Sequence, residues 1–248
     1  MDLRSSVSLL LLLGVCSGLH GQVRTHPLNV VGSINFLIEG DILIPKKRTA
    51  MKCLKNAYSC LWSKSANGWV DIPYRLSSKY DNSEKRVIVN AMKDFEYKTC
   101  IRFIQRSTQR MYLSIEPRLG CSSTLGRTGD KQVVSLQRFG CVRRGIVQHE
   151  LLHAMGFYHE HTRSDRDRYV KINWNNIKKY FVYNFDKKDT NNLGTPYDYS
   201  SVMHYGRTAF GKLGAETIIP IPDSSVPIGQ RHGLSDIDIR RINRLYKC

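Results

Sequence analysis

The sequence predicts a single α+β domain, and three features of the chain lead to this fold class. Short apolar segments typical of β-strands gather between residues 70 and 136, and helix candidates lie among and after them. The stretch Asp186–Gly233 is rich in Gly, Pro and Asn, which favours irregular structure. The chain has 248 residues, 41% of them apolar, so it is long enough for one catalytic domain and is not a disordered chain.

The individual elements follow from periodicity and from residues that begin or end helices. Val70–Leu76 is predicted to be a strand, and Pro73 suggests that it lies at an edge. Ser83 can cap a helix that runs to Lys98, because apolar residues recur at helical spacing after it. Further strands are expected at Ile101–Ile104, Met111–Ile115 and Gln132–Leu136, and further helices at Gly145–Phe157, Asn173–Phe185 and Ser235–Tyr246.

Residues 1–21 have the features of a secretory signal peptide. Arg4 supplies a positive start, Val7–Val15 is an apolar run, and small residues follow from Cys16 to Gly18. The run is too short for a membrane anchor, since spanning a bilayer takes about 20 residues. We therefore expect a secreted, extracellular protein with no membrane anchor.

The cysteine count agrees with secretion. Seven cysteines become six when Cys16 is removed with the signal peptide, and an even number in a secreted chain suggests three disulfides. The spacing alone does not choose among the possible pairings. The six are Cys53, Cys60, Cys100, Cys121, Cys141 and Cys248.

The most informative segment has the pattern H-E-x-x-H-x-x-G-x-x-H. His149 and His153 lie four residues apart, so on a helix they share a face and can bind one metal ion. Gly156 allows a sharp turn that brings His159 back as a third ligand. Three imidazoles leave one position of a zinc ion open, which a catalytic site requires, and Glu150 can reach a water molecule there.

This pattern and several segments after it resemble the astacin family of zinc endopeptidases, which are metzincins. The resemblance extends over about Glu39 to Cys248 and includes Phe157-Tyr158-His159-Glu160, Arg163, Asp165-Arg166-Asp167 and Ser201-Val202-Met203-His204-Tyr205. The extra pair Cys53 and Cys60 resembles the six-cysteine astacins of fishes, which include hatching enzymes. The resemblance implies a two-lobed protease domain, with a twisted mixed sheet and helices in the N-terminal lobe. The C-terminal lobe would be mostly irregular and end in a helix.

The resemblance also implies a role for each matching residue. One Zn²⁺ per chain would be bound by His149, His153 and His159. Glu150 would be the general base and then a proton donor, and Tyr205 would stabilise the oxyanion of the attacked peptide bond. Met203 would lie beneath the metal, and Glu160 would contact the new amino terminus after activation. Without the resemblance, Met203 and Tyr205 would be interpreted as packing residues.

Residues 22–48 would then be a propeptide, and residues 49–248 the catalytic domain. Ile38-Glu39-Gly40-Asp41 resembles the family motif F-x-G-D, with Ile38 in place of phenylalanine and Phe36 nearby. The resemblance implies that Asp41 binds the zinc in the zymogen. The basic cluster before Thr49 indicates cleavage after Arg48 by a trypsin-like protease, and a solvated charge run is the alternative.

The resemblance further implies three disulfides, Cys53–Cys60, Cys100–Cys248 and Cys121–Cys141. One departure from the family pattern is His161, where glutamine is common, and it suggests no function. The formal charge of +17 falls by 2 when residues 1–48, with five basic and three acidic side chains, are removed. The sequence contains no nucleic-acid-binding module, so this charge indicates either attraction to acidic extracellular partners or a solvated basic surface.

The predicted function is therefore that of a secreted, monomeric zinc endopeptidase, made as a zymogen that could be stored in granules. Its expected substrates are extracellular proteins, and digestion of egg-envelope glycoproteins at hatching is the specific hypothesis. The alternative is a catalytically weak protein of the same fold that binds matrix or glycans through its basic surface.

Overall fold

The computed structural model describes residues 36–44 and 60–248, and the statements below concern these residues. The expected signal peptide, the activation site at Arg48 and Thr49, and Cys53 lie outside them. None of the helices in the described ranges is both long and apolar enough to cross a membrane.

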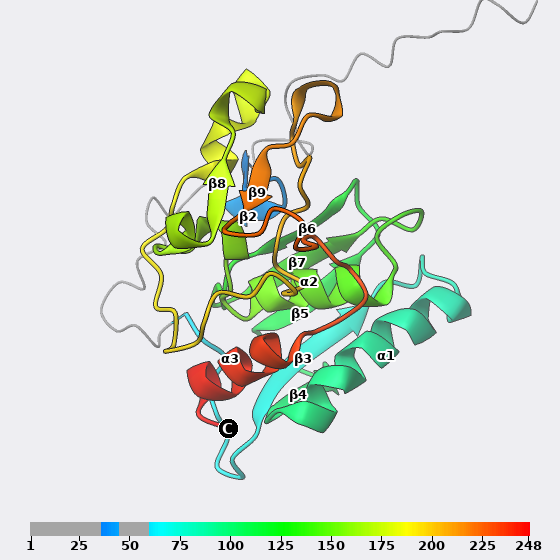
Figure 1. Ribbon diagram of the computed structural model, residues 1–248. Coiled ribbons are helices and arrows are strands. Elements are labelled where there is room, and N and C mark those ends of the chain that lie inside the picture. Colours follow the sequence, from blue (N-terminus) through cyan, green and yellow to red (C-terminus); the bar gives the residue numbers. More distant parts are fainter. Residues whose placement is uncertain (1–35, 45–59) are drawn as a thin grey trace, which may run out of the picture.

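A mixed seven-stranded sheet forms the centre of the larger lobe, in the order β1-β2-β6-β7-β5-β3-β4 (Figure 1). Strand β3 pairs in parallel with β4 and with β5, and β5 pairs in parallel with β7. Strand β6 runs antiparallel to β7. The bounds are β1 Phe36–Ile38, β2 Ile42–Ile44, β3 Val70–Leu76, β4 Ile101–Gln105, β5 Tyr112–Glu116, β6 Cys121–Thr124 and β7 Lys131–Leu136.

Helices α1 (Asn82–Lys98) and α2 (Arg144–Ala154) contact each other and lie on one face of this sheet (Figure 1). Burial is the reason, because α1 places fully buried side chains, among them Ile88 and Phe95, against strand residues such as Leu113. The start of α1 is capped by Asp81, whose Oδ1 accepts hydrogen bonds from the backbone N–H groups of Ser83 and Glu84. The predicted cap at Ser83 is therefore two residues too late.

Helix α3 (Asp236–Tyr246) is capped by Ser235 and returns to the larger lobe. Its residues Ile242 and Tyr246 are buried in the same apolar core as α1 and α2. Disulfides join Cys100 to Cys248 and Cys121 to Cys141, which are two of the three expected pairs. Cys60 is also disulfide-bonded, and its expected partner Cys53 lies outside the described residues.

The second lobe has little regular structure. It contains the antiparallel strands β8 (Val170–Ile172) and β9 (Ile218–Pro220) and its own apolar cluster around Phe185, Tyr205 and Ile218. Five 3₁₀ helices complete the described elements, and all of them lie outside the larger lobe's sheet: η1 Glu160–Thr162, η2 Arg166–Arg168, η3 Trp174–Asn176, η4 Lys179–Phe185 and η5 Lys212–Gly214. The prediction of a two-lobed α+β fold is confirmed.

Further local predictions also differ from the structure. The α-helix expected over Asn173–Phe185 is replaced by η3 and η4, in a segment of Asn and aromatic residues that lower helix propensity. Strands β1, β2, β6, β8 and β9 are absent from the predicted elements. Strand β6 is not predicted because its sequence C-S-S-T lacks an apolar alternation. Strand β3 lies between β4 and β5, so the edge position inferred from Pro73 is wrong; the missing donor costs only one ladder hydrogen bond.

Candidate active site

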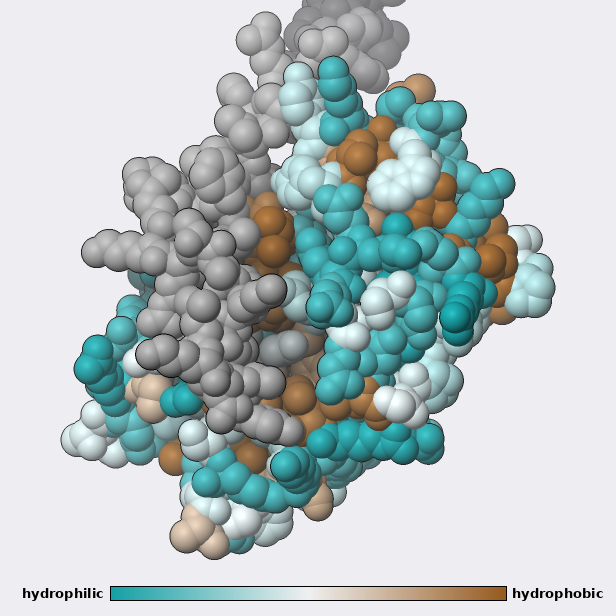
Figure 2. Space-filling view, turned by 90° about the vertical axis from the view of Figure 1, so that its left-hand side faces the viewer, coloured by the Kyte–Doolittle hydropathy of each residue, from teal (hydrophilic) through white to brown (hydrophobic). Residues whose placement is uncertain are grey.

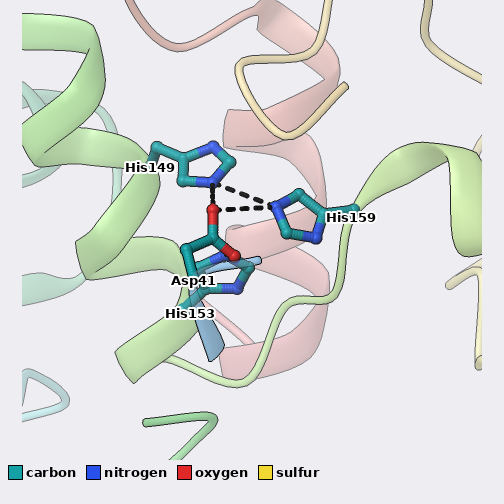
Figure 3. A group of neighbouring side chains, drawn as sticks. All are labelled: Asp41, His149, His153 and His159. Carbon is teal, nitrogen blue, oxygen red and sulfur yellow. Dashed lines mark hydrogen bonds and ion pairs between the residues drawn. The ribbon is translucent and has the colours of Figure 1, made fainter. Parts of the chain in front are cut away.

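Three histidines from two segments converge beside strand β6. Helix α2 carries His149 and His153 on one face and ends at Ala154, three residues earlier than predicted. Gly156 then takes a φ of +102°, a left-handed conformation that favours glycine, and the chain turns back so that His159 faces the helix (Figure 3). The Nε2 atoms of His149 and His159 lie 3.1 Å apart, and all three rings are buried.

The hydrogen bonds of the outer ring nitrogens determine the tautomers. His149 Nδ1 lies 2.8 Å from the carbonyl oxygen of Val202, and His153 Nδ1 lies 2.8 Å from that of Phe157. His159 Nδ1 lies 2.7 Å from the Glu39 carboxylate. Since each of these oxygens can only accept, each Nδ1 carries a proton, and in the neutral form of each ring Nε2 has its lone pair directed at the common centre.

Asp41 supplies a fourth donor group to this centre (Figure 3). Its Oδ2 lies 3.1 Å from His149 Nε2 and 3.3 Å from His159 Nε2, and its Oδ1 lies 3.4 Å from His153 Nε2. Four ligands at about 2.0–2.1 Å from a tetrahedral zinc are about 3.4 Å from one another, close to these separations. Asp41 Oδ1 and His153 Nε2 are buried polar atoms without a hydrogen-bond partner in the described structure, so the residues fit a zinc ion.

The charges of the cluster are strongly perturbed. Burial lowers the pKa of His149 to about 3, which keeps that imidazole neutral. Burial also acts to lower the pKa of His159, but the carboxylates of Asp41 and Glu39 outweigh it and raise the value to about 9. Burial alone would raise the pKa of Asp41, yet the neighbouring histidines hold it well below its usual range. A metal ion bound here therefore replaces a proton as the partner of the Asp41 carboxylate.

Glu150 lies on α2 directly after His149 and is almost completely buried. Its Oε2 has no hydrogen-bond partner in the described structure. Burial, and secondly the charge of Asp41, raise the pKa of Glu150 well above its usual value. A carboxyl group with a raised pKa, next to a metal site, is suited to exchange protons near neutral pH.

Tyr205 lies beside His159, while Met203 is buried in the apolar core of the larger lobe. The Tyr205 ring centre is 4.5 Å from that of His159, and it stacks on the ring of His161 with centres 3.9 Å apart. The Tyr205 hydroxyl donates a hydrogen bond to the backbone carbonyl of Glu39. Burial raises the pKa of Tyr205 well above its usual value, so the hydroxyl keeps its proton and remains a donor.

The segment before the predicted activation site forms a hairpin across the site. Strands β1 and β2 pair with each other, and β2 pairs in parallel with β6 through Ile42 and Ser123. The turn between them holds Glu39, Gly40 and Asp41, and the Ser123 N–H donates to the Asp41 carbonyl at 3.0 Å. A Cβ atom on Gly40, whose φ is +78°, would lie 2.6 Å from the Phe210 ring, so another residue would strain the backbone and force the ring to move.

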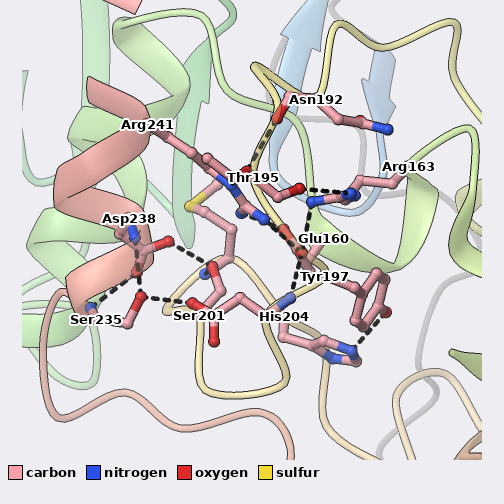
Figure 4. A network of polar contacts seen from close by, with 12 residues as sticks. Glu160, Arg163, Asn192, Thr195, Tyr197, Ser201, His204, Ser235, Asp238 and Arg241 are labelled. Atoms are coloured by element: carbon pink, nitrogen blue, oxygen red, sulfur yellow. Dashed lines mark hydrogen bonds and ion pairs between the residues drawn. The ribbon is translucent and has the colours of Figure 1, made fainter. Parts of the chain in front are cut away.

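The turn that contains Met203 is held from helix α3 (Figure 4). Asp238 accepts hydrogen bonds from Ser201 Oγ at 2.6 Å and from the Val202 N–H at 3.0 Å. The Val202 carbonyl in turn accepts from His149, so Asp238 acts on the site through two other residues. No sequence pattern indicates this role, because Asp238 lies in the first turn of a helix, where an acidic residue is ordinary.

Glu160 is buried at the centre of a second polar network (Figure 4). Its Oε1 accepts from Arg241 Nη2 at 2.8 Å and from the Asp198 N–H at 2.8 Å, and Arg163 lies 3.4 Å away. Burial raises the pKa of Glu160 in spite of these partners. The predicted contact with an amino terminus at Thr49 lies outside the described residues, so that role stays a prediction.

Two further histidines of these segments do not join the cluster. His204 Nδ1 lies 2.7 Å from the Tyr205 carbonyl and its Nε2 lies 2.7 Å from the Tyr197 hydroxyl. His161 Nε2 lies 3.0 Å from the Asn184 carbonyl. The four-residue group of Asp41, His149, His153 and His159 thus has the only donor set of this kind in the described ranges.

Residues 61–247 match the peptidase family Astacin. The chain belongs to this family. Its membership among the astacin metalloendopeptidases establishes the enzyme class, and this family depends on zinc.

Several proteins similar to this astacin are hatching enzymes by name. It is 62% identical to the low choriolytic enzyme of Oryzias latipes over 216 residues, which are 87% of this chain and 80% of that protein. It is 55% identical to high choriolytic enzyme 1 of the same fish over 213 residues, 86% of this chain and 78% of that protein. The structure of high choriolytic enzyme 1, described as a hatching enzyme zinc-protease, matches with a TM-score of 0.77 and 56% identity over 80% of this chain and 99% of that one.

Proposed function

We propose that this astacin is secreted as a zymogen and, after activation, digests proteins of the egg envelope at hatching. The observation that carries the zymogen part is the position of Asp41 against three imidazoles, in a segment that precedes the basic cluster Lys46-Lys47-Arg48. The signal-like residues 1–21 support secretion, with storage in granules before release. The choriolytic names of proteins 62% and 55% identical support the egg-envelope substrate.

One zinc ion per chain would be held by His149, His153 and His159, with Asp41 as a fourth ligand in the precursor. When bound, zinc supplies Lewis acidity, which polarises a carbonyl oxygen and lowers the pKa of a water molecule to about 7. The chain orients the three imidazoles through their Nδ1 hydrogen bonds and excludes solvent by burying them.

Two side chains of the active enzyme would handle the protons and charge of peptide hydrolysis. Glu150 would accept a proton from the attacking water and deliver it to the nitrogen of the leaving amine. The Tyr205 hydroxyl, released from Glu39, would donate a hydrogen bond to the oxyanion that develops on the scissile carbonyl. No covalent bond between enzyme and substrate is needed.

The hairpin Phe36–Ile44 would keep the precursor inactive in three ways. Its strand β2 occupies the edge of β6, where an extended substrate could otherwise pair. Its Asp41 occupies the fourth position of the metal site and contributes to the raised pKa of Glu150. Its Glu39 carbonyl engages the Tyr205 hydroxyl. Cleavage after Arg48 by a trypsin-like protease would release all three contacts.

The proposal is tested with the purified precursor and an egg-envelope preparation. Trypsin treatment is expected to give a protein that begins at Thr49, read by mass spectrometry, and to switch on envelope digestion that a zinc chelator abolishes. The Asp41→Ala precursor is expected to cleave a peptide substrate before trypsin treatment, and a fully latent variant would contradict the role of Asp41. Cleavage of general peptides without envelope digestion would contradict the substrate.

Glu150→Gln provides the catalytic control. After activation it is expected to lose about 10²–10⁴-fold in turnover, the range for a general acid–base group, while it still binds zinc. Salt-sensitive binding to the envelope that persists in this variant would show how the basic surface contributes independently of cleavage.

A further inference from the structure

His159 differs from the other two histidines of the site in where its outer nitrogen finds a partner. His149 and His153 donate from Nδ1 to backbone carbonyls of the catalytic domain, those of Val202 and Phe157. His159 donates from Nδ1 to the side chain of Glu39, 120 residues away in the hairpin. Glu39 is the one partner of this nitrogen in the described residues, so cleavage after Arg48 would remove it.

Glu39 is held firmly against His159. Its side chain is completely buried, and Oε2 accepts from the His159 ring at 2.7 Å and from the His159 backbone N–H at 3.3 Å. Its other oxygen, Oε1, lies 3.5 Å from Lys188 Nζ, an ion pair with the second lobe. The backbone of Glu39 has a φ of +51°, a left-handed conformation that is uncommon for residues other than glycine.

A buried carboxylate in this position has a defined effect on a metal site. It fixes the ring so that Nε2 points at the metal, and its negative charge makes Nε2 a more basic ligand. Losing such a partner typically costs about 10–100-fold in metal affinity. A backbone carbonyl orients a ring in the same way but carries no full charge, so the Glu39 contact is the strongest of the three.

We infer that Glu39 is a positioning residue: by orienting His159, it makes the precursor bind zinc more tightly. This role is separate from that of Asp41, which occupies the fourth position of the metal site. This rests on the proposed zymogen. The precursor site has two carboxylates that the mature enzyme lacks, one against the metal and one behind His159. The precursor therefore acquires and retains zinc more tightly than the activated enzyme does, and the metal is in place before activity begins.

The test measures zinc affinity of the intact precursor by competition with a chromophoric chelator, with no activity assay. The Glu39→Ala precursor is expected to bind zinc about 10–100-fold more weakly than the wild type. Glu39→Gln is expected to fall between the two, because the amide oxygen still accepts from His159 but lacks the charge. The matched control is Glu216→Gln, which changes a carboxylate at an exposed position of the second lobe and is expected to leave the affinity unchanged.

Three measurements separate positioning from loss of structure. Cobalt(II) in the precursor site is expected to show a changed visible absorption in Glu39→Ala and a smaller change in Glu39→Gln. Lys188→Gln, which removes the ion pair from the other side, is expected to weaken zinc binding in the precursor by less than Glu39→Ala. After trypsin activation the wild type and both Glu39 variants have the same chain and are expected to bind zinc equally.

A Glu39→Ala precursor that holds zinc within about twofold of the wild type would overturn the inference. So would a difference in affinity that persists unchanged after activation, since the effect would then not depend on the propeptide. The activity of the uncleaved Asp41→Ala precursor tests a different claim. If that precursor is still inactive, the role of Asp41 in the zymogen is refuted, but the comparison of zinc affinities still tests Glu39.

Discussion

Asp238 illustrates how a single side chain controls the site from a distance. It is buried in helix α3 and accepts hydrogen bonds from Ser201 and from the backbone of Val202, the residue whose carbonyl orients His149. Burial raises the pKa of Asp238 although these donors act in the opposite direction. The charged form of the buried carboxylate is therefore stable only while both of its oxygens accept hydrogen bonds.

Replacing Asp238 by asparagine should destabilise the protein. One oxygen becomes an NH₂ group, which cannot accept from Ser201 or Val202, and a buried donor is left unpaired. We expect the free energy of unfolding to fall by about 1–3 kcal/mol, measured by urea denaturation. Asp236→Asn, an exposed position of the same helix, is the matched control and should change it by less than about 0.5 kcal/mol. Equal effects of the two variants would contradict this reasoning.

At the scale of elements, the turn of the β1–β2 hairpin contacts the Phe210 ring with one residue and the histidines of the metal site with its neighbours. Gly40 passes close to the Phe210 ring while Glu39 faces His159 and Asp41 faces the metal site. A two-stranded hairpin is marginally stable by itself, so its position depends on these contacts and on the pairing of β2 with β6.

Gly40→Ala should therefore weaken latency. The added Cβ meets Phe210, and alanine is strained at a φ of +78°, which together cost about 1–2 kcal/mol. We expect the uncleaved precursor to show on the order of tenfold more activity on a small peptide than the wild type. Replacing Lys46, Lys47 and Arg48 by glutamine in both proteins prevents accidental activation. Unchanged latency would show that the turn tolerates a side chain.

Strands β5 and β7 are joined on one face by an ion-pair cluster around Glu116. Its carboxylate lies 3.0 Å from Lys131 and 2.8 Å from Arg118. Burial alone would raise the pKa of Glu116, but hydrogen bonds from Ser114, Lys131 and Arg118 outweigh it and lower the value from 4.5 to about 2. A lowered pKa stabilises the fold above the unfolded value of 4.5, and this contribution is lost as the pH falls toward about 2.

Glu116→Gln is expected to be less stable than the wild type at pH 7 and equally stable near pH 2. The difference at pH 7 should be only about 1 kcal/mol, because solvent screens a cluster whose basic side chains are nearly half exposed. Unfolding by urea at several pH values measures it. A difference that does not shrink between pH 4.5 and about 2 would mean that packing, not charge, is responsible.

At the scale of the whole molecule, the two lobes have separate apolar clusters, and the site lies where they meet. Met203 belongs to the cluster of the larger lobe, while Tyr205, two residues later, belongs to the other. On the right-hand side of Figure 2 hydrophilic side chains cover most of the surface, and patches of apolar residues lie among them. The carboxyl end returns to the larger lobe through α3 and the disulfide Cys100–Cys248.

Removing that disulfide should affect the stability of the whole domain. It joins residues separated by 148 positions, whereas Cys121–Cys141 spans 20. We expect the double variant Cys100→Ser, Cys248→Ser to lose about 2–5 kcal/mol of unfolding free energy, and the Cys121, Cys141 double variant to lose about 1–2 kcal/mol less. Thermal and urea denaturation compare them. A larger loss from the shorter bridge would show that local strain matters more than loop closure.

Much of the fold is predictable because the relevant signals are local. Helices α1, α2 and α3 and strands β3, β4, β5 and β7 follow from apolar spacing and capping residues. Among the elements that differ from the prediction, β6, β8 and β9 owe their conformation to pairing with other strands, as β2 does where it pairs with β6. Strand β6 is defined only by its neighbours β7 and β2.

The sequence by itself determined the metal-binding pattern, since residues four apart share a helix face and the glycine turn returns the third histidine. Only the tertiary structure decided which atoms orient those histidines. Val202 and Glu39 lie 53 and 120 residues from the rings they contact, and Asp238 lies 36 residues from Val202. Hydrogen bonds over such separations follow from how the lobes and the hairpin pack, and no local periodicity encodes them.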